Sequence, residues 1–135
     1  MLEHVAIWTR DLEGMKDFYC AYFDGKAGAK YRSKSAAHPN FESYFLTFGD
    51  GSRLELMQMP TIPESAYAPG QEALGLTRIA FAVGGTDEVD ALAKRAHAEG
   101  RPVLLEPHRN GDGYYEACIL DPDGNRVEVT TLPEA

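Results

Sequence analysis

Four ionisable residues occupy matching places in a sequence that repeats itself, and their side chains suit chemistry at a shared site. His4 and Glu55 in the first half correspond to Arg78 and Glu128 in the second half. An imidazole and two carboxylates can bind a divalent metal ion or transfer protons between adjacent carbon atoms. A guanidinium has no lone pair to donate and stays protonated, so Arg78 cannot be a metal ligand.

The correspondence rests on two repeated segments. DGSRLEL at 50–56 returns as DGNRVEV at 123–129, 73 residues later. HVAI at 4–7 is matched by RIAF at 78–81, 74 residues later. Two matches at nearly the same offset indicate two copies of one unit. We therefore predict a single domain over 1–135, in which module one spans 1–60, a linker spans 61–73 and module two spans 74–135.

Module one contains the pattern of a strand, a helix and further strands. Asp11 is a predicted N-cap, and the residues after it carry apolar side chains at helical spacing. These apolar residues are Leu12, Met15, Phe18, Tyr19, Tyr22 and Phe23. Strands are predicted at 3–9, 43–48 and 53–59, with another suggested at 30–33. Asp50-Gly51 is a hairpin turn signal between the last two strands.

Module two repeats the same order of elements. Thr86 is a predicted N-cap for a helix that ends at Gly100. The apolar face of this helix comprises Val89, Leu92, Ala93 and Ala96. Strands are predicted at 77–83, 101–106, 114–120 and 126–131. Each module is therefore expected to be a β-α-β-β-β unit.

Side chains alternate between the two faces of a strand, which separates the ionisable residues from the predicted core. The residues predicted on the faces away from the helices are His4, Trp8, Glu55, Met57, Arg78 and Glu128. If the two modules pack about a pseudo-twofold axis, the four polar positions converge. Tyr114, Tyr115 and Glu116 open a predicted strand, and we expect the two tyrosines to bind substrate at the rim of the same site.

The bulk composition excludes several classes of protein. The chain has 135 residues, 44% of them hydrophobic, which is enough for a real core. A formal charge of −8 argues against a nucleic-acid-binding surface. No apolar run is long enough to span a bilayer and nothing indicates export, so we expect a cytoplasmic protein without a membrane partner. Cys20 and Cys118 are expected to be buried, reduced thiols.

The segments HVAIW, DGSRLELMQ, LTRIAF and GDGYYEACILDPDGNRVEVT resemble the vicinal oxygen chelate superfamily, which includes glyoxalase, bleomycin-resistance and dioxygenase proteins. The resemblance implies an α+β fold of two tandem βαβββ modules. These modules form a cupped, mostly antiparallel eight-stranded sheet with helices on the outer face. It also implies a small-molecule ligand, a homodimer, and a divalent metal held by residues at positions 4, 55, 78 and 128.

Two functions from different classes follow from the resemblance. In the first, His4, Glu55 and Glu128 hold Zn, Ni, Mn or Fe, and Glu55 or Glu128 transfers a proton in a lyase or isomerase reaction on a small oxygenated molecule. In the second, Arg78 takes the place of a metal ligand, and the protein is a metal-free, drug-sequestering protein of the bleomycin-resistance type. In both, the expected substrate-binding residues are Arg78, Trp8, Met57, Tyr114 and Tyr115. Whether the protein is an enzyme is left open by the sequence.

Overall fold

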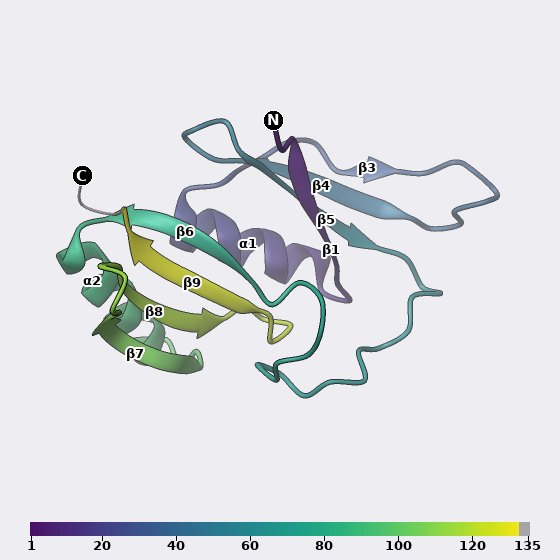
Figure 1. The fold of residues 1–135 in the computed structure, drawn as a ribbon. Coiled ribbons are helices and arrows are strands. Elements are labelled where there is room, and N and C mark those ends of the chain that lie inside the picture. The colour runs from purple at the N-terminus through teal and green to yellow at the C-terminus, as the bar shows by residue number, and fades with distance from the viewer. Residues whose placement is uncertain (133–135) are drawn as a thin grey trace. The chain divides into compact units, whose positions relative to one another are not determined.

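The computed structural model describes residues 1–132, which form two compact units that divide between Ala66 and Tyr67. Residues 133–135, the end of the expected module two, lie outside the described residues. Each unit contains one helix and one sheet (Figure 1). This arrangement confirms the predicted α+β fold. Unit two has the predicted β-α-β-β-β order, and unit one has the same order with one additional short strand.

Unit one contains a mixed sheet in which the first strand pairs with the last. Its strands are β1 (His4–Trp8), β2 (Lys26–Ala27), β3 (Tyr31–Arg32), β4 (Glu42–Thr47) and β5 (Arg53–Gln58). The order is β1-β5-β4-β2, and β3 also pairs with β4. β1 runs parallel to β5, whereas the other pairs are antiparallel. The strand suggested at 30–33 is confined to β3, and β2 is a short strand that the sequence pattern did not predict.

Helix α1 (Leu12–Phe23) begins where the sequence predicted. The Asp11 carboxylate accepts a hydrogen bond from the Gly14 amide at 2.9 Å, which satisfies one of the free donors at the helix start. The apolar stripe of the helix packs on β4 and β5. Its buried residues are Leu12, Met15, Phe18, Tyr19 and Tyr22, and the strands contribute Leu46, Leu54 and Leu56.

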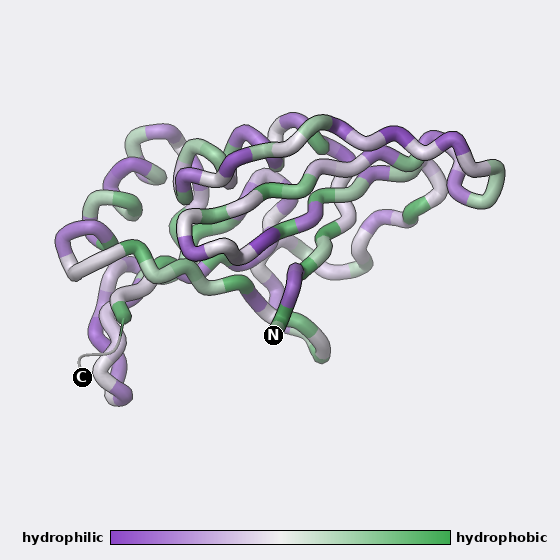
Figure 2. Tube along the Cα trace, turned by 90° about the horizontal axis from the view of Figure 1, so that it is seen from above, coloured by the Kyte–Doolittle hydropathy of each residue, from purple (hydrophilic) through white to green (hydrophobic). Residues whose placement is uncertain are grey.

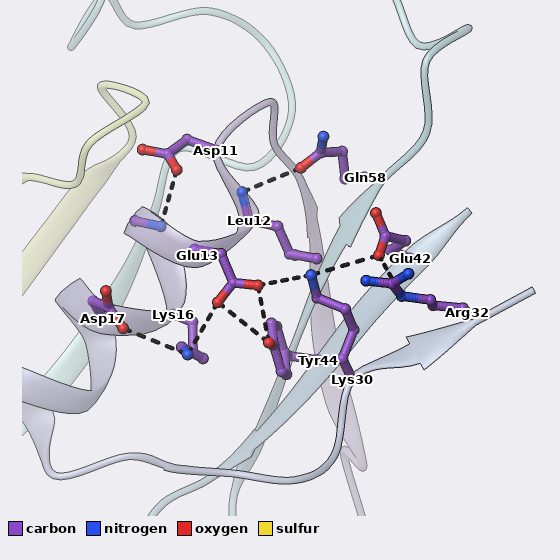
Figure 3. A network of polar contacts seen from close by, with 11 residues as sticks. Asp11, Leu12, Glu13, Lys16, Asp17, Lys30, Arg32, Glu42, Tyr44 and Gln58 are labelled. Atoms are coloured by element: carbon purple, nitrogen blue, oxygen red, sulfur yellow. Dashed lines mark hydrogen bonds and ion pairs between the residues drawn. The ribbon is translucent and has the colours of Figure 1, made fainter. Parts of the chain in front are cut away.

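A polar network ties α1 to the sheet of unit one (Figure 3). The Tyr44 hydroxyl of β4 donates to the Glu13 carboxylate of α1 at 2.9 Å. The ammonium groups of Lys30 and Lys16 lie 2.7 and 3.0 Å from the same carboxylate. These donors, Lys30 foremost, lower the pKa of Glu13 to about 2.

Unit two contains a four-stranded sheet of order β6-β9-β8-β7. Its strands are β6 (Arg78–Gly84), β7 (Val103–Arg109), β8 (Tyr115–Leu120) and β9 (Arg126–Thr131). β6 runs parallel to β9, while β8 is antiparallel to both β7 and β9. The first strand of the unit again lies beside the last, as β1 lies beside β5. The repeat in the sequence is therefore a repeat in topology.

Helix α2 (Thr86–Ala98) packs on all four strands of its sheet. Its buried residues Val89, Ala93 and Ala96 face the buried Val127 and Val129 of β9. The expectation that Thr86 caps this helix is wrong, because Gly85 is the N-cap and Thr86 is the first helical residue. The Glu88 carboxylate accepts from the Gly85 amide at 2.8 Å and so closes the first turn.

Short apolar and polar stretches alternate along the chain trace (Figure 2). Among residues 1–132, no helix is both long and apolar enough to cross a membrane.

Both cysteines are free; Cys118 is buried as expected, but Cys20 is only half-buried. Burial raises the pKa of each thiol, which keeps both in the unreactive protonated form at neutral pH.

Candidate functional site

In unit one the register of β1 and β5 fixes which side chains share a face. Ala6 lies opposite Glu55, and Trp8 lies opposite Met57. On β5 the alternating residues Leu54 and Leu56 are buried, and α1 packs on this strand. Glu55 and Met57, together with the β1 side chains in register with them, therefore lie on the other face. We call this surface, formed by His4, Trp8, Phe45, Glu55 and Met57, the helix-free face of unit one. The sequence alternation predicted this placement for His4, Trp8, Glu55 and Met57, whereas Phe45 was not assigned to a face.

His4 and Glu55 meet on the helix-free face of unit one. The His4 Nε2 atom lies 3.6 Å from Glu55 Oε1, and the Glu55 side chain is only 16% exposed. The His4 ring contacts the Phe45 ring edge-on, with 5.2 Å between the ring centres. An imidazole nitrogen and a carboxylate oxygen so placed can both accept from one hydrogen-bond donor, or both approach one cation.

The other nitrogen of His4 is occupied by Glu3. His4 Nδ1 is hydrogen-bonded to the Glu3 carboxylate, which also pairs with Arg53 Nε at 2.9 Å. The hydrogen bond to His4 is the main cause of a lowered pKa for Glu3, so Glu3 is ionised at neutral pH. The Arg53 guanidinium in turn lies over the Phe45 ring, 4.0 Å from its centre. Sequence reasoning did not single out Glu3 or Arg53.

Aromatic residues extend the helix-free face of unit one beyond Trp8. The Phe41 ring lies edge-on to Trp8 and close to Tyr31, at 5.9 and 6.2 Å between ring centres. Trp8 is 40% exposed and Tyr31 is 57% exposed, so both present ring surface to a ligand. Sequence reasoning missed Tyr31 and Phe41, because they lie in the 26–42 segment whose strands are too short to show a period.

In unit two Arg78 forms an ion pair with Glu128. The Arg78 Nε atom lies 2.7 Å from Glu128 Oε2, and the side chains are 45% and 14% exposed. Glu128 lies opposite Ala80 of β6 and between the buried Val127 and Val129 of β9. Arg78 and Glu128 therefore share the face of this sheet opposite α2, the helix-free face of unit two.

Glu128 also has an acidic neighbour. Burial is the main cause that raises the pKa of Glu128, the nearby Glu116 carboxylate raises it further, and Arg78 opposes both. The Asn110 side-chain amide donates to Glu116, and His108 Nε2 lies 3.9 Å from Glu116 Oε1. A polar row thus crosses the helix-free face of unit two from β6 to β7. Glu116 was noticed in the sequence only as part of a possible rim.

The two tyrosines expected at the rim lie in different surroundings. Tyr115 does not lie on the helix-free face: its hydroxyl donates to Asp90 of α2 at 2.6 Å, so the side chain lies on the helix side of the sheet. Tyr114 immediately precedes β8 and is half-buried, and its carbonyl accepts from the Asn110 amide at 2.8 Å. We correct the expectation for Tyr115 accordingly.

The residues do not fit the four-ligand metal site that the resemblance implied. Within the described part of either unit taken alone, no group of three or more His, Cys, Asp and Glu side chains is arranged to hold a metal ion. His4 and Glu55 supply two donors within unit one, whereas a catalytic metal ordinarily has at least three protein ligands. Glu128 is already paired with Arg78, which cannot itself be a ligand.

Comparison with protein families gives one match that spans almost the whole chain. The model described as the Glyoxalase/Bleomycin resistance protein/Dioxygenase superfamily matches residues 1–129. No curated protein matches the sequence significantly.

Solved structures of similar fold come from several bacteria. A lactoylglutathione lyase from Agrobacterium tumefaciens is 27% identical, with a TM-score of 0.66 over 97% of this chain and 92% of its own. A glyoxylase/bleomycin resistance protein/dioxygenase domain from Frankia sp. is 18% identical, with a TM-score of 0.78 over 97% and 96%. The fosfomycin resistance protein FosX from Listeria monocytogenes, solved with Mn(II) and sulfate, is 18% identical, with a TM-score of 0.69 over 98% and 92%. At 18% identity, the last two show the fold alone.

Proposed function

The chain belongs to the Glyoxalase/Bleomycin resistance protein/Dioxygenase superfamily, and we propose that it binds a small organic molecule without a metal ion. The observation that carries the proposal is the Arg78–Glu128 ion pair, 2.7 Å from Nε to Oε2. A guanidinium beside the carboxylate supplies the positive charge that a metal would otherwise supply. The fold alone does not decide the function, which is inferred from these side chains.

The helix-free face of unit one favours a ligand that carries both a cationic group and an aromatic ring. His4 Nε2 and Glu55 Oε1 are two acceptors 3.6 Å apart, and a protonated amine can donate to both. Trp8 and the nearby Phe41 offer ring faces and edges that suit an aromatic or cationic group. A chain of net charge −8 also attracts cations over a longer range.

Unit two, taken by itself, offers hydrogen-bond donors on its own helix-free face. Arg78 uses its Nε–H for Glu128, and a guanidinium has five N–H donors in all. At 45% exposure, the Arg78 side chain remains accessible to an oxygen atom of a small molecule. We propose Arg78 as a ligand-binding residue and Glu128 as the residue that holds it in place.

A metal-dependent lyase or isomerase is the alternative. In that case Zn, Ni, Mn or Fe would be held by His4, Glu55 and Glu128, and Glu128 would first have to leave Arg78. The similar structures include a lactoylglutathione lyase and a FosX solved with Mn(II). The Glu128 carboxylate, paired with Arg78, does not fit a metal ion.

Trp8 is the sole tryptophan of the chain, so its fluorescence reports on the helix-free face of unit one. We expect an aromatic quaternary ammonium probe to change Trp8 emission saturably, and an uncharged aromatic probe of similar size to bind more weakly. Glu55→Gln should weaken binding of the cation at least about tenfold, because a charge-assisted contact is lost. Glu64→Gln, on an exposed glutamate that pairs with Arg10, is the matched control and should bind as wild type does. Equal affinity of wild type and Glu55→Gln for the cation would contradict the proposal.

A further inference from the structure

We propose that Glu3 is a positioning residue for His4: it holds the proton of the neutral imidazole on Nδ1 and thereby leaves the Nε2 lone pair directed at Glu55. The inference rests on the proposed function only for the role it assigns to Nε2. The contact that carries it is the hydrogen bond between His4 Nδ1 and the Glu3 carboxylate. An ionised carboxylate only accepts hydrogen bonds, so the nitrogen that contacts it must carry the hydrogen.

Glu3 is itself held in place from two directions. It precedes β1 directly, and its carboxylate pairs with Arg53 Nε at 2.9 Å. Arg53 lies opposite His4 in the β1–β5 register, and its guanidinium covers the Phe45 ring at 4.0 Å. The same Phe45 ring meets the edge of the His4 imidazole. The orientation of the His4 ring is therefore fixed by its contact with the Phe45 ring and by the hydrogen bond between Nδ1 and Glu3.

This arrangement has a consequence for Nε2. In the neutral ring with hydrogen on Nδ1, Nε2 bears only a lone pair, and Glu55 Oε1 at 3.6 Å is also an acceptor. Two acceptors that face each other do not satisfy each other, so both are available to a donor or a cation on a ligand. In the opposite tautomer, Nε2 would carry a hydrogen directed at Glu55. Nε2 could then no longer accept a hydrogen bond from a ligand. A carboxylate that orients a functional histidine through its second nitrogen is a common device in proteins.

The role is one of orientation and not of stability. Glu3 and His4 are 53% and 36% exposed, and an exposed pair of this kind contributes little to folding. Removing the Glu3 charge should therefore change the His4 tautomer while leaving the fold intact.

The test is the nitrogen spectrum of the His4 side chain, recorded by long-range ¹H–¹⁵N correlation without ligand at about pH 8.5, well above the ordinary His pKa. The His4 signals are assigned by their loss in His4→Gln. In wild type, Nδ1 should show the protonated and Nε2 the unprotonated type of shift. In Glu3→Gln this preference should be lost and the two tautomers should mix, while Glu3→Asp should retain it in part.

Glu106→Gln is the matched control, because Glu106 Oε1 lies 2.6 Å from His97 Nε2 in a similar exposed pair. It should alter the His97 signals and leave those of His4 unchanged. A wild-type His4 that carries its hydrogen on Nε2 overturns the inference, and so does an unchanged tautomer in Glu3→Gln. Because no ligand is present, these failures are distinct from a failure of the proposed function, which the Trp8 titration reports.

Discussion

Arg78 and Glu128 lie side by side on neighbouring parallel strands, with 2.7 Å between Nε and Oε2. The strand that carries Arg78 is the counterpart, in the second repeat, of the strand that carries His4. The same place in two copies of one unit thus holds a potential metal ligand in one copy and a fixed cation in the other. This difference separates the two functions that the family membership leaves open.

Replacing Arg78 with alanine should destabilise the protein in a pH-dependent way. Glu128, only 14% exposed, would lose the cation that opposes the rise of its pKa. We expect a loss of about 1–3 kcal/mol in the free energy of unfolding at pH 7, where the unpaired carboxylate is charged. An acid whose pKa is raised on folding loses stability as pH rises above its unfolded value, so the loss should shrink toward about pH 5.

Urea unfolding of wild type and Arg78→Ala at both pH values measures this effect. Arg95→Ala is the control, since Arg95 forms an exposed pair with Glu99 on α2 and should cost little at either pH. An equal loss for Arg78→Ala at both pH values would show that Glu128 is not the group responsible.

Acid should weaken the contact between α1 and its sheet through Glu13. The pKa of Glu13 is lowered to about 2, so its contribution to stability is present above the unfolded value and is lost as pH falls from about 4.5 to about 2. Because Glu13 is about half exposed, Glu13→Gln should cost no more than about 1 kcal/mol at pH 7 and nothing near pH 2. Thermal unfolding across this range checks it. A pH dependence in Glu13→Gln identical to that of wild type would contradict the assignment.

Leu56 and Met57 are adjacent on β5 but face opposite sides of the sheet. Leu56 is completely buried against α1, whereas Met57 is half-buried on the helix-free face. Leu56→Ala should therefore destabilise the protein by about 2–5 kcal/mol, and Met57→Ala by about 1 kcal/mol or less. Urea unfolding of the two variants compares them directly. Similar losses would mean that the faces of β5 have been misassigned.

Much of the fold could be predicted because two independent periodicities agree. The repeat of DGxR-aliphatic-E-aliphatic at 50–56 and 123–129 predicted two modules, and strand alternation placed Glu55 and Glu128 opposite the core. The edge strands β1 and β6 alternate clearly between exposed and half-buried residues, which makes such reasoning reliable there.

The misplaced and missed residues lie where that alternation fails. β8 is buried on both faces from Ala117 to Leu120, so its sequence gave no sign that Tyr115 points to the helix. β2 and β3 have two residues each, too few to show a period. Glu3 lies just outside β1, and its contact with His4 depends on how the chain enters the strand.

The most direct test of the central claim, metal-independent binding, is the metal content of protein purified without chelators, followed by calorimetric titration with Zn²⁺, Ni²⁺ and Mn²⁺. We predict no stoichiometric metal in the purified wild-type protein and no saturable metal binding in the titration, because Arg78 is paired with Glu128. Arg78→His should release Glu128, add an imidazole and raise metal affinity by about an order of magnitude or more. Stoichiometric, tightly bound metal in the wild-type protein would contradict the account and support the metal-dependent lyase or isomerase instead.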